Sequence, residues 1–511
     1  PCKRWPAPSA SSWERGAYRR GPLPRPPLLT RVLVRFSFVV KIACARISDF
    51  FRARGLIFGA AAQERPEMKD FAPIETDFNA LYVNNIYRHA SDVCNRPVAG
   101  VVATTVPLKE RETRDNGWTY HYTGRTDEVI NLGSYNYLGF SQSEGPCADE
   151  AAAFIDSFGI HVDGTRHSGG NHRIIIELER EIARYLGVED VITYPMGFGS
   201  NAMAIPTLAD EDTLVLSDEV NHASMCFGCR TACVTVITFK HNNVRDAEEK
   251  LRQAILRGNH KRNGAPFKKV IVAIEGIYSM EGSIVDLPGF VALKKKYGLY
   301  LYIDEAHSIG ALGPTGRGIV EYWGLDPRDV DCLMGTLTKS FAGSGGYIGG
   351  SKRTIDFLRS RGIGACYGAV LSPAVIGQVV GAMRIMTGAD GTRIGQWKRD
   401  QLRRNTRYFR RRLEAMGFRL AGHDDSPVVP LMTYFLTKVV AFGRETLRRG
   451  VATISVGFPA TPLTEARARF CLSAEHTREQ IDQVLKVLDD VGDITGTKYG
   501  RKEPNNVVIE Y

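Results

Sequence analysis

Residues 300–308 read Tyr-Leu-Tyr-Ile-Asp-Glu-Ala-His-Ser, an apolar run that ends in acidic, imidazole and hydroxyl side chains. The apolar run predicts a buried β-strand, and residues 269–274 and 331–335 predict two more. A helical stretch at 290–296, which stops at Gly298, separates the first two strands. The strands begin about thirty residues apart, which is the length of a βαβ unit. This spacing predicts an α/β fold with a mostly parallel sheet flanked by helices.

Polar side chains follow the end of each predicted strand. Ser279 lies beyond the first strand, and Asp304 and His307 follow the second. Lys339 lies just beyond the third. Parallel sheets bind ligands outside the carboxyl ends of their strands, so we expect these side chains to share a site.

Lys339 stands between Thr338 and Ser340, and a glycine-rich run follows it. One interpretation is a structural ion pair with a nearby acid. Another is a nucleotide phosphate loop, but residues 335–339 lack the G-x-x-x-x-G-K-[ST] spacing. The third is a pyridoxal phosphate site, which needs a lysine, a carboxylate for the pyridine nitrogen, donors for the phosphate and a flat group over the ring.

The sequence supplies each part of such a site. Asp304 can pair with the ring nitrogen, His307 can reach the ring hydroxyl, and His222 can cover the ring. A helix is expected directly after the predicted strand 191–194, and its first amides can hold a phosphate. The phosphate donors are then Ser279, Thr336, Thr338 and the amides of Gly197 and Phe198.

Longer motifs around these residues resemble the α-oxoamine synthases, a family of fold-type I pyridoxal phosphate enzymes. The similarity runs from about residue 70 to the end of the chain, and the matching stretches are 130–139, 216–224, 275–284, 302–318, 405–412, 456–462 and 467–473. Within the family, these stretches look like the lysine-bearing, catalytic long-chain-base subunits that begin sphingolipid synthesis.

The resemblance implies a role for each site residue. Lys339 would be the Schiff-base lysine, Asp304 would hold the ring nitrogen, and His222 would stack on the ring; these three are the expected catalytic residues. The expected cofactor-binding residues are Lys339, Asp304, His307, His222, Ser279, Thr336, Thr338, Gly197 and Phe198. The expected substrate-binding residues are Arg469, which would hold the amino acid carboxylate, Tyr135 and Asn136. No metal is implied.

The resemblance also implies a reaction, the decarboxylating condensation of L-serine with a long-chain acyl-CoA, expected to be palmitoyl-CoA, to 3-ketosphinganine. It implies a heterodimer with a lysine-lacking first subunit, with small regulatory membrane subunits as further partners. Two alternatives stay open. One is a sister reaction that forms 5-aminolevulinate, 8-amino-7-oxononanoate or 2-amino-3-ketobutyrate, and the other is a non-catalytic scaffold subunit.

One stretch departs from the family pattern. Residues 167–176 do not match, and Ile175 stands where the family has a histidine. Since this loop is expected near the substrate, the departure leaves the acyl-chain and amino acid preference open. A gene-model error or a divergent paralogue would both produce it.

The net charge of +10 lies in the first sixty residues, which hold twelve Lys or Arg residues and two acids. The remainder is neutral, which argues against a nucleic-acid surface. Residues 28–58 mix apolar and basic side chains, as in an amphipathic membrane-surface helix or an Arg-rich transit peptide. A disordered tail is a third interpretation for the proline-rich start. The resemblance favours an endoplasmic reticulum membrane location with the active site facing the cytosol.

The chain is expected to divide into four parts: a basic, partly disordered arm at 1–60 with an amphipathic segment, a segment at 61–135 that packs on the core, a large cofactor domain at 136–385 and a small α+β domain at 386–511. The basic helix at 398–416 is interpreted as a solvated face. The ten cysteines include a C-x-x-C pair at 226–229, but no second pair follows at zinc-ligand spacing, so we expect unligated thiols.

Overall fold

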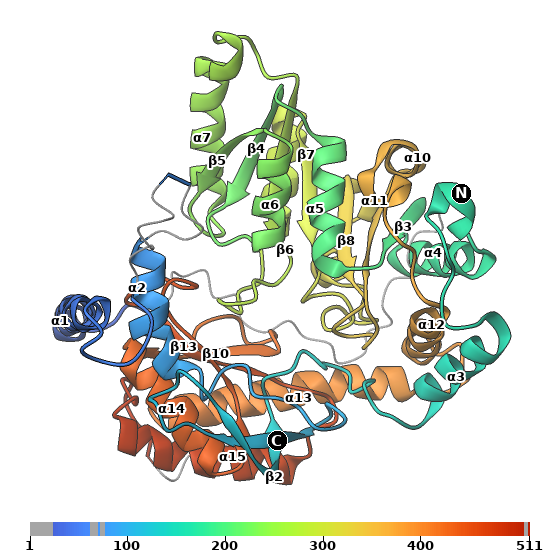
Figure 1. Cartoon of the computed structure of the whole chain (residues 1–511). Coiled ribbons are helices and arrows are strands. Elements are labelled where there is room, and N and C mark those ends of the chain that lie inside the picture. Colours follow the sequence, from blue (N-terminus) through green and yellow to red (C-terminus); the bar gives the residue numbers. More distant parts are fainter. Residues whose placement is uncertain (1–23, 62–69, 72–76, 505–508) are drawn as a thin grey trace.

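The computed structural model describes residues 24–61, 70–71, 77–504 and 509–511. Its centre is a seven-stranded sheet in the order β3-β9-β8-β7-β6-β4-β5 (Figure 1). The strands are β3 (Asp190–Tyr194), β4 (Thr213–Asp218), β5 (Thr235–Phe239), β6 (Lys269–Glu275), β7 (Tyr300–Asp304), β8 (Cys332–Thr336) and β9 (Gly346–Gly350). Only β9 runs antiparallel to its neighbours β3 and β8. The other six strands therefore end at the same edge, and the expected mostly parallel sheet is confirmed.

Helices cover both faces of the sheet. Neighbouring side chains on a strand point to opposite faces, so a strand that is apolar throughout needs a cover on each side. Val215 packs in the core on one face, under α5 (Gly197–Leu208), α6 (Ala223–Thr231), α10 (Lys352–Arg361) and α11 (Ile363–Cys366). Leu214 and Leu216 pack in the core on the other face, under α4 (Arg173–Leu186), α7 (Val244–Arg257), α8 (Leu287–Tyr297), α9 (Ile319–Trp323) and α12 (Pro373–Thr387), with α3 (Pro146–Phe158) packed against α12. The predicted helix at 290–296 is the end of α8, and Gly298 caps it in the left-handed conformation at φ 65°.

The C-terminal part has two small sheets. Strands β10 (Val428–Tyr434), β13 (Ala466–Cys471) and β12 (Ile454–Val456) form one sheet, packed with α13 (Ile394–Ala415), α14 (Leu436–Arg448) and α15 (Arg478–Thr495). The other joins β1 (Thr105–Glu112) and β2 (His121–Asn131) to β11 (Val451–Ala452). The segment before the large sheet thus pairs with the C-terminal part. The domain limits at 60, 135 and 385 stay predictions.

Helix α13 corrects one expectation from the sequence, because it is not simply a solvated basic face. Lys398 is only 7% exposed; it pairs with Glu475 and donates to the carbonyl oxygen of Leu138 at 2.9 Å. Arg410 is only 3% exposed and donates to two backbone carbonyls at 3.0 and 2.8 Å. Burial of these two charges is tolerated because each one is hydrogen-bonded to backbone carbonyl oxygens, and Lys398 also pairs with a carboxylate.

The N-terminal helix α1 (Leu28–Ala53) lies at the edge of the molecule beside α2 (Asp77–Asn85) and the C-terminal part (Figure 1). Val34 packs with Met432 and Tyr434, and the Phe38 ring lies 5.6 Å from that of Phe458. Within the described residues, no helix is long and apolar enough to cross a membrane. Disorder was expected mainly for the proline-rich start of the chain. Most of that stretch, residues 1–23, lies outside the described residues.

Candidate active site

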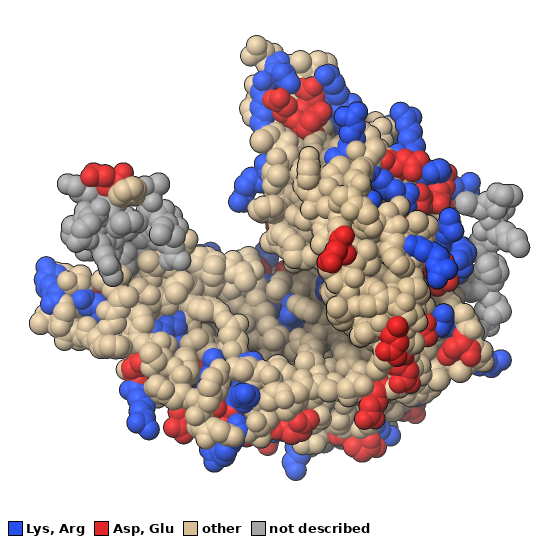
Figure 2. Space-filling model, turned by 45° about the vertical axis from the view of Figure 1, so that its right-hand side comes forward, with Lys and Arg blue, Asp and Glu red and all other residues tan. Residues whose placement is uncertain are grey.

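Lys339 lies in the turn between β8 and β9, at the carboxyl edge of the sheet. Its Nζ atom is 5.2 Å from the centroid of the Tyr135 ring, and Cζ of Arg469 is 4.8 Å from the same centroid. Tyr135 follows β2, and Arg469 lies on β13 in the C-terminal part. Figure 2 shows a hollow between the large sheet domain and the C-terminal part, with basic side chains inside it. Three chain segments far apart in sequence therefore meet at one aromatic ring.

Burial lowers the pKa of the Lys339 amine to about 8, and the carboxylates of Asp304 and Glu275 oppose this shift. The side chain is still partly accessible. At pH 7 about one lysine in ten is then neutral, whereas a free lysine is almost entirely protonated. Lys339 is thus a reactive amine that a ligand can reach.

Asp304 ends β7, where it is 4% exposed. Its Oδ2 accepts from Asn201 Nδ2 at 2.7 Å, and its Oδ1 accepts from the amide of Ala306 at 2.9 Å. Asn201 is itself oriented by the hydroxyl of Tyr302, which donates to Asn201 Oδ1 at 2.7 Å. These contacts hold a carboxylate rigidly at the floor of the site.

Two histidines lie near Lys339, and both are held neutral. Burial lowers the pKa of His307 well below its usual value, and Lys339, Arg469 and His222 lower it further. Burial is also the main cause of the lowered pKa of His222, with Asp304 opposing and Lys339 reinforcing the shift. Neutral imidazoles can stack or donate a single hydrogen bond without adding positive charge.

Hydrogen bonds orient both rings. The hydroxyl oxygen of Tyr137 lies 2.7 Å from His307 Nδ1, and burial raises the pKa of this hydroxyl. This contact fixes the plane of the His307 ring and leaves its Nε2 atom for a ligand. His222 caps α6, and its Nδ1 lies 2.7 Å from the hydroxyl oxygen of Ser224.

Four of the five predicted phosphate residues, Gly197, Phe198, Thr336 and Thr338, are brought together at the start of α5. No side chain caps this helix, so the first-turn amides of Gly197 and Phe198 have no partner within the helix. The hydroxyl oxygens of Thr336 and Thr338 are 2.7 Å apart. A Cβ atom on Gly197 would lie 2.7 Å from Thr336 Oγ1. Amides and hydroxyls thus converge where only glycine allows the approach, which fits a phosphate group.

The other predicted residues lie as follows. Ser279 Oγ accepts from Arg469 Nη1 at 3.0 Å, so it orients the arginine in this structure. Arg469 is 4% exposed, and its Nε has no hydrogen-bond partner among the described residues. Asn136 donates to Ser141 Oγ at 2.6 Å, and its buried Oδ1 also lacks a partner among the residues described. These unsatisfied polar atoms are consistent with a polar ligand.

Three buried residues of the site were not predicted from the sequence, namely Asn201, Tyr137 and Glu275. Asn201 is 0% exposed and lies one turn after Gly197, where a buried amide on an apolar helix is a usable signal. Glu275 pairs in register with Asp304 and accepts from the amide of His222 at 2.5 Å. Burial, and then Asp304, raise the pKa of Glu275 well above its usual value.

The divergent stretch 167–176 forms an irregular turn at 166–170 and the start of α4. Ile175 is 0% exposed and packs in the large core cluster. His167 Nε2 lies 2.8 Å from the carbonyl oxygen of Arg359. In the described parts of the chain, no cluster of His, Cys, Asp and Glu is placed to hold a metal ion.

The site combines four features that together define a class of protein. They are a partly accessible lysine of low pKa, a fixed carboxylate at the neighbouring strand end, neutral imidazoles and an uncapped helix start. These are the parts of a fold-type I, pyridoxal-phosphate-dependent enzyme. The model of the family "Aminotransferase class I and II" matches residues 127–488, in agreement with this class.

Similar proteins narrow the class. Serine palmitoyltransferase 3 of Caenorhabditis elegans is 51% identical over 94% of this chain and 94% of its own length. Serine palmitoyltransferase 3 of Homo sapiens is 45% identical over 93% of this chain and 86% of its own length. The solved structure of Sphingomonas wittichii serine palmitoyltransferase is 27% identical, has a TM-score of 0.72, and is matched over 83% of this chain and 99% of its own length. The chain belongs to the serine palmitoyltransferase family.

Proposed function

We propose that this chain catalyses the decarboxylating condensation of L-serine with a long-chain acyl-CoA, palmitoyl-CoA in particular, to 3-ketosphinganine. One observation carries the proposal: Lys339 and Arg469 approach the same Tyr135 ring from different parts of the chain. An amino acid whose carboxylate binds Arg469 then presents its Cα to Lys339. The names of the similar proteins supply the substrate class.

Pyridoxal phosphate is the cofactor, and when bound it withdraws electrons from the Cα of an attached amino acid. The Asp304 carboxylate stabilises a proton on the ring nitrogen. His307 would hold the ring oxygen through a hydrogen bond at Nε2. The uncapped start of α5, with Thr336 and Thr338, holds the phosphate.

Lys339 acts as the proton carrier of the reaction. Its Nζ, neutral in part of the population because burial lowers its pKa to about 8, removes the proton from Cα of bound serine. The Arg469 guanidinium, oriented by the Ser279 hydroxyl, binds the serine carboxylate. His222 covers the reacting group from the start of α6 and excludes water from that side.

Substrate choice can be tested directly on the purified chain with a companion subunit. Labelled serine, alanine or glycine is supplied with acyl-CoAs of different length, and the ketone product is identified by mass spectrometry. We expect serine and palmitoyl-CoA to give the fastest turnover and Lys339→Ala to abolish it. Aminolevulinate formed from glycine and succinyl-CoA would instead assign a sister reaction. A Lys339→Ala variant as active as the parent chain would assign a scaffold.

We further propose that the enzyme works at the endoplasmic reticulum membrane with its active site facing the cytosol, as a heterodimer with a lysine-lacking long-chain-base subunit and with small regulatory membrane subunits. The exposed apolar side chains of α1 support membrane contact. They include Leu28, Leu29, Val32, Phe36, Val39 and Ile47, each more than half exposed. Co-purification with a tagged companion subunit from detergent extracts tests the heterodimer, and recovery of this chain alone would contradict it.

A further inference from the structure

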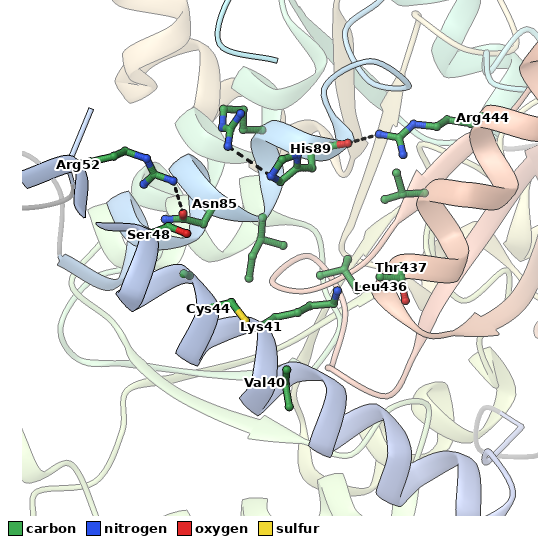
Figure 3. A pocket seen from close by; sticks show the side chains of 14 residues that line it. Val40, Lys41, Cys44, Ser48, Arg52, Asn85, His89, Leu436, Thr437 and Arg444 are labelled. Atoms are coloured by element: carbon green, nitrogen blue, oxygen red, sulfur yellow. Dashed lines mark hydrogen bonds between the residues drawn. The ribbon is translucent and has the colours of Figure 1, made fainter. Parts of the chain in front are cut away.

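A cavity of about 530 Å³ lies between α1, the segment α2 to η2 (Tyr87–Ala90), and α14. It is distinct from the candidate active site, because none of its lining residues belongs to that site. Its size is within the usual range of small-molecule pockets. Figure 3 shows Lys41 of α1 reaching across the opening toward Leu436 and Thr437 of α14.

All the charged side chains of the lining are cationic. They are Lys41, Arg52, Arg88 and Arg444, and no carboxylate is among the lining residues. Three acids act on these cations. Asp92 binds Arg444, with Nη2 and Oδ1 2.9 Å apart, and Asp49 lies 3.6 Å from Arg52. Burial and the Arg52 charge lower the pKa of Arg88, and the Asp115 carboxylate opposes this shift. Four cations against three carboxylates leave an excess of positive charge.

Two of the cations are available to a ligand. Lys41 is partly buried and forms no hydrogen bond or ion pair with any residue that the structure describes. Arg52 is 8% exposed and donates to Asn85 Oδ1 at 2.5 Å. Its buried Nη1 lies 3.6 Å from Asp49 Oδ1, an ion pair too long for a hydrogen bond, and has no hydrogen-bond partner among the described residues. A buried guanidinium nitrogen without an acceptor is costly unless an anion supplies one.

The pKa of His89 shows the effect of the positive charges inside the cavity. Burial lowers its pKa, and the nearby cations Arg88, Arg444, Arg52 and Lys41 lower it further. Its Nε2 lies 3.3 Å from Arg88 Nη2, which suits a neutral imidazole that accepts a hydrogen bond. The unbalanced charge therefore acts on the interior of the cavity as well as on its rim.

The lining also has an apolar part, which extends toward the opening of the cavity. The apolar lining residues are Val40, Ala45, Ile86, Leu436 and Val440. Val40 is 43% exposed and lies one turn after Phe36, which is 64% exposed on the outer side of α1. A ligand with an anionic end and hydrocarbon chains can thus place its charge among the cations and its chains along α1.

We propose that this cavity binds the phosphate group of an anionic membrane lipid, whose acyl chains run over Val40 onto the exposed apolar side of α1. Lys41 and Arg52 contact the phosphate, and Arg88 and Arg444 contribute at longer range. Basic clusters on amphipathic helices and basic pockets in membrane proteins both bind anionic lipid headgroups. The natural source of the lipid rests on the proposed membrane attachment, whereas binding of the phosphate does not depend on catalysis.

Cys44 allows the site to be tested, because it is exposed and lines the cavity. The holoenzyme is alkylated with a maleimide, and labelling of Cys44 is followed by peptide mass spectrometry, with exposed Cys233 as the internal reference. The added probes are dihexanoyl phosphatidic acid as dissolved monomers, dihexanoyl phosphatidylcholine, inorganic phosphate and coenzyme A. Dissolved probes make the result independent of membrane attachment and of turnover.

We expect phosphatidic acid to slow labelling of Cys44 without affecting Cys233, and phosphatidylcholine to have little effect. Lys41→Gln should raise the half-protecting concentration about fivefold, since one cation is worth about 1 kcal/mol in such contacts. Arg35→Gln removes an exposed charge on the same helix outside the cavity, so it should leave protection unchanged. Thermal melting of both variants verifies that they are folded.

Four outcomes would overturn the proposal. Equal protection by inorganic phosphate would assign a soluble phosphate ligand, and stronger protection by coenzyme A would assign the cavity to the acyl-CoA substrate. No protection by phosphatidic acid, or protection that Lys41→Gln leaves intact, would show that the cavity does not hold a lipid phosphate.

Discussion

Lys339 carries its proton less firmly than an ordinary lysine, since burial lowers its pKa to about 8. Its neutral form, which attacks the cofactor aldehyde, therefore grows as the pH rises through about 8 and is nearly complete one unit above. We expect the rate at which the apoenzyme takes up pyridoxal phosphate to rise about tenfold between pH 7 and a plateau above pH 9. Visible absorbance after rapid mixing measures this rate.

Lys352→Ala is the matched control for this pH profile, because Lys352 is an exposed lysine paired with Asp356 at 2.8 Å. This variant should keep the profile of the parent chain. A rate that still climbed steeply above pH 9 would show that the Lys339 amine has the pKa of a solvated lysine.

A second prediction concerns Arg469, which Ser279 orients and which we expect to bind the serine carboxylate. Lysine at position 469 keeps the charge but loses the paired donors that suit a carboxylate. Losing one charge-assisted hydrogen bond costs about 1.5–3 kcal/mol, so Arg469→Lys should raise KM for serine about 10- to 100-fold. KM for the acyl-CoA should change little. Steady-state kinetics with each substrate varied in turn measures the two KM values separately. An equal rise in both KM values would show that Arg469 does not bind serine.

At the scale of elements, His476 ties the end of β13 to β2. Its Nδ1 accepts from the amide of Ser473 at 3.0 Å, and its Nε2 donates to the carbonyl oxygen of Asn131 at 3.0 Å. Burial lowers its pKa to about 4, although the bond to Asn131 opposes the shift. The unfolded chain takes up this proton near pH 6.5 and the folded chain only near pH 4, so stability falls as the pH drops through this window.

The loss amounts to about 2 kcal/mol of unfolding free energy between pH 7.5 and pH 5. His476→Gln removes the titrating group, so the variant should lose about 2 kcal/mol less than the parent chain over this interval. Denaturant unfolding at both pH values measures the difference. Exposed His121→Gln is the control and should retain the full pH dependence. Identical pH dependence in all three proteins would mean that His476 titrates normally in the folded chain.

The elements that the sequence predicted well are those whose signal is local. Strands β6, β7 and β8 are apolar runs that stop at polar side chains, and the predicted helix at 290–296 has its glycine stop. Strand β9 was not predicted, because Gly346-Tyr-Ile-Gly-Gly350 has almost no strand propensity and forms a strand only by pairing with β3 and β8. The burial of Lys398 depends on Glu475, a partner 77 residues away.

The residues of the site show the same difference: those with a local sequence signal were predicted, and those defined by distant contacts were not. The lysine, aspartate and histidines were predicted because each lies next to a strand end or in a long motif, and the structure brings them to one edge. Asn201 and Tyr137 were missed because they act on Asp304 and His307 through contacts that only the folded chain creates. Sequence patterns identify the chemical groups, whereas tertiary packing decides which residues orient them.

At the scale of the whole molecule, α1 is an amphipathic element whose apolar side chains the rest of the described chain leaves uncovered. Phe36 and Val39 are 64% and 66% exposed, although Val34 on the opposite side of the helix is buried against the C-terminal part. The C-terminal part therefore fixes the orientation of the helix, and the apolar side that carries Phe36 and Val39 faces outward. Such a surface is suited to the headgroup region of a membrane.

Replacing these two side chains tests whether the apolar side of α1 attaches the enzyme to a membrane. Burying one large apolar side chain contributes about 1.5–3 kcal/mol, so Phe36→Glu with Val39→Glu should lower binding to phosphatidylcholine–phosphatidylserine vesicles at least tenfold. Flotation measures the binding. Ile255→Glu with Leu256→Glu makes the same change on α7, where both side chains are also exposed, and should float like the parent chain. The visible absorbance of bound cofactor should be equal in all three proteins, because α1 contributes no residue to the site. Loss of flotation in both double variants would assign the effect to net charge, and unchanged flotation in both would place membrane attachment elsewhere in the assembly.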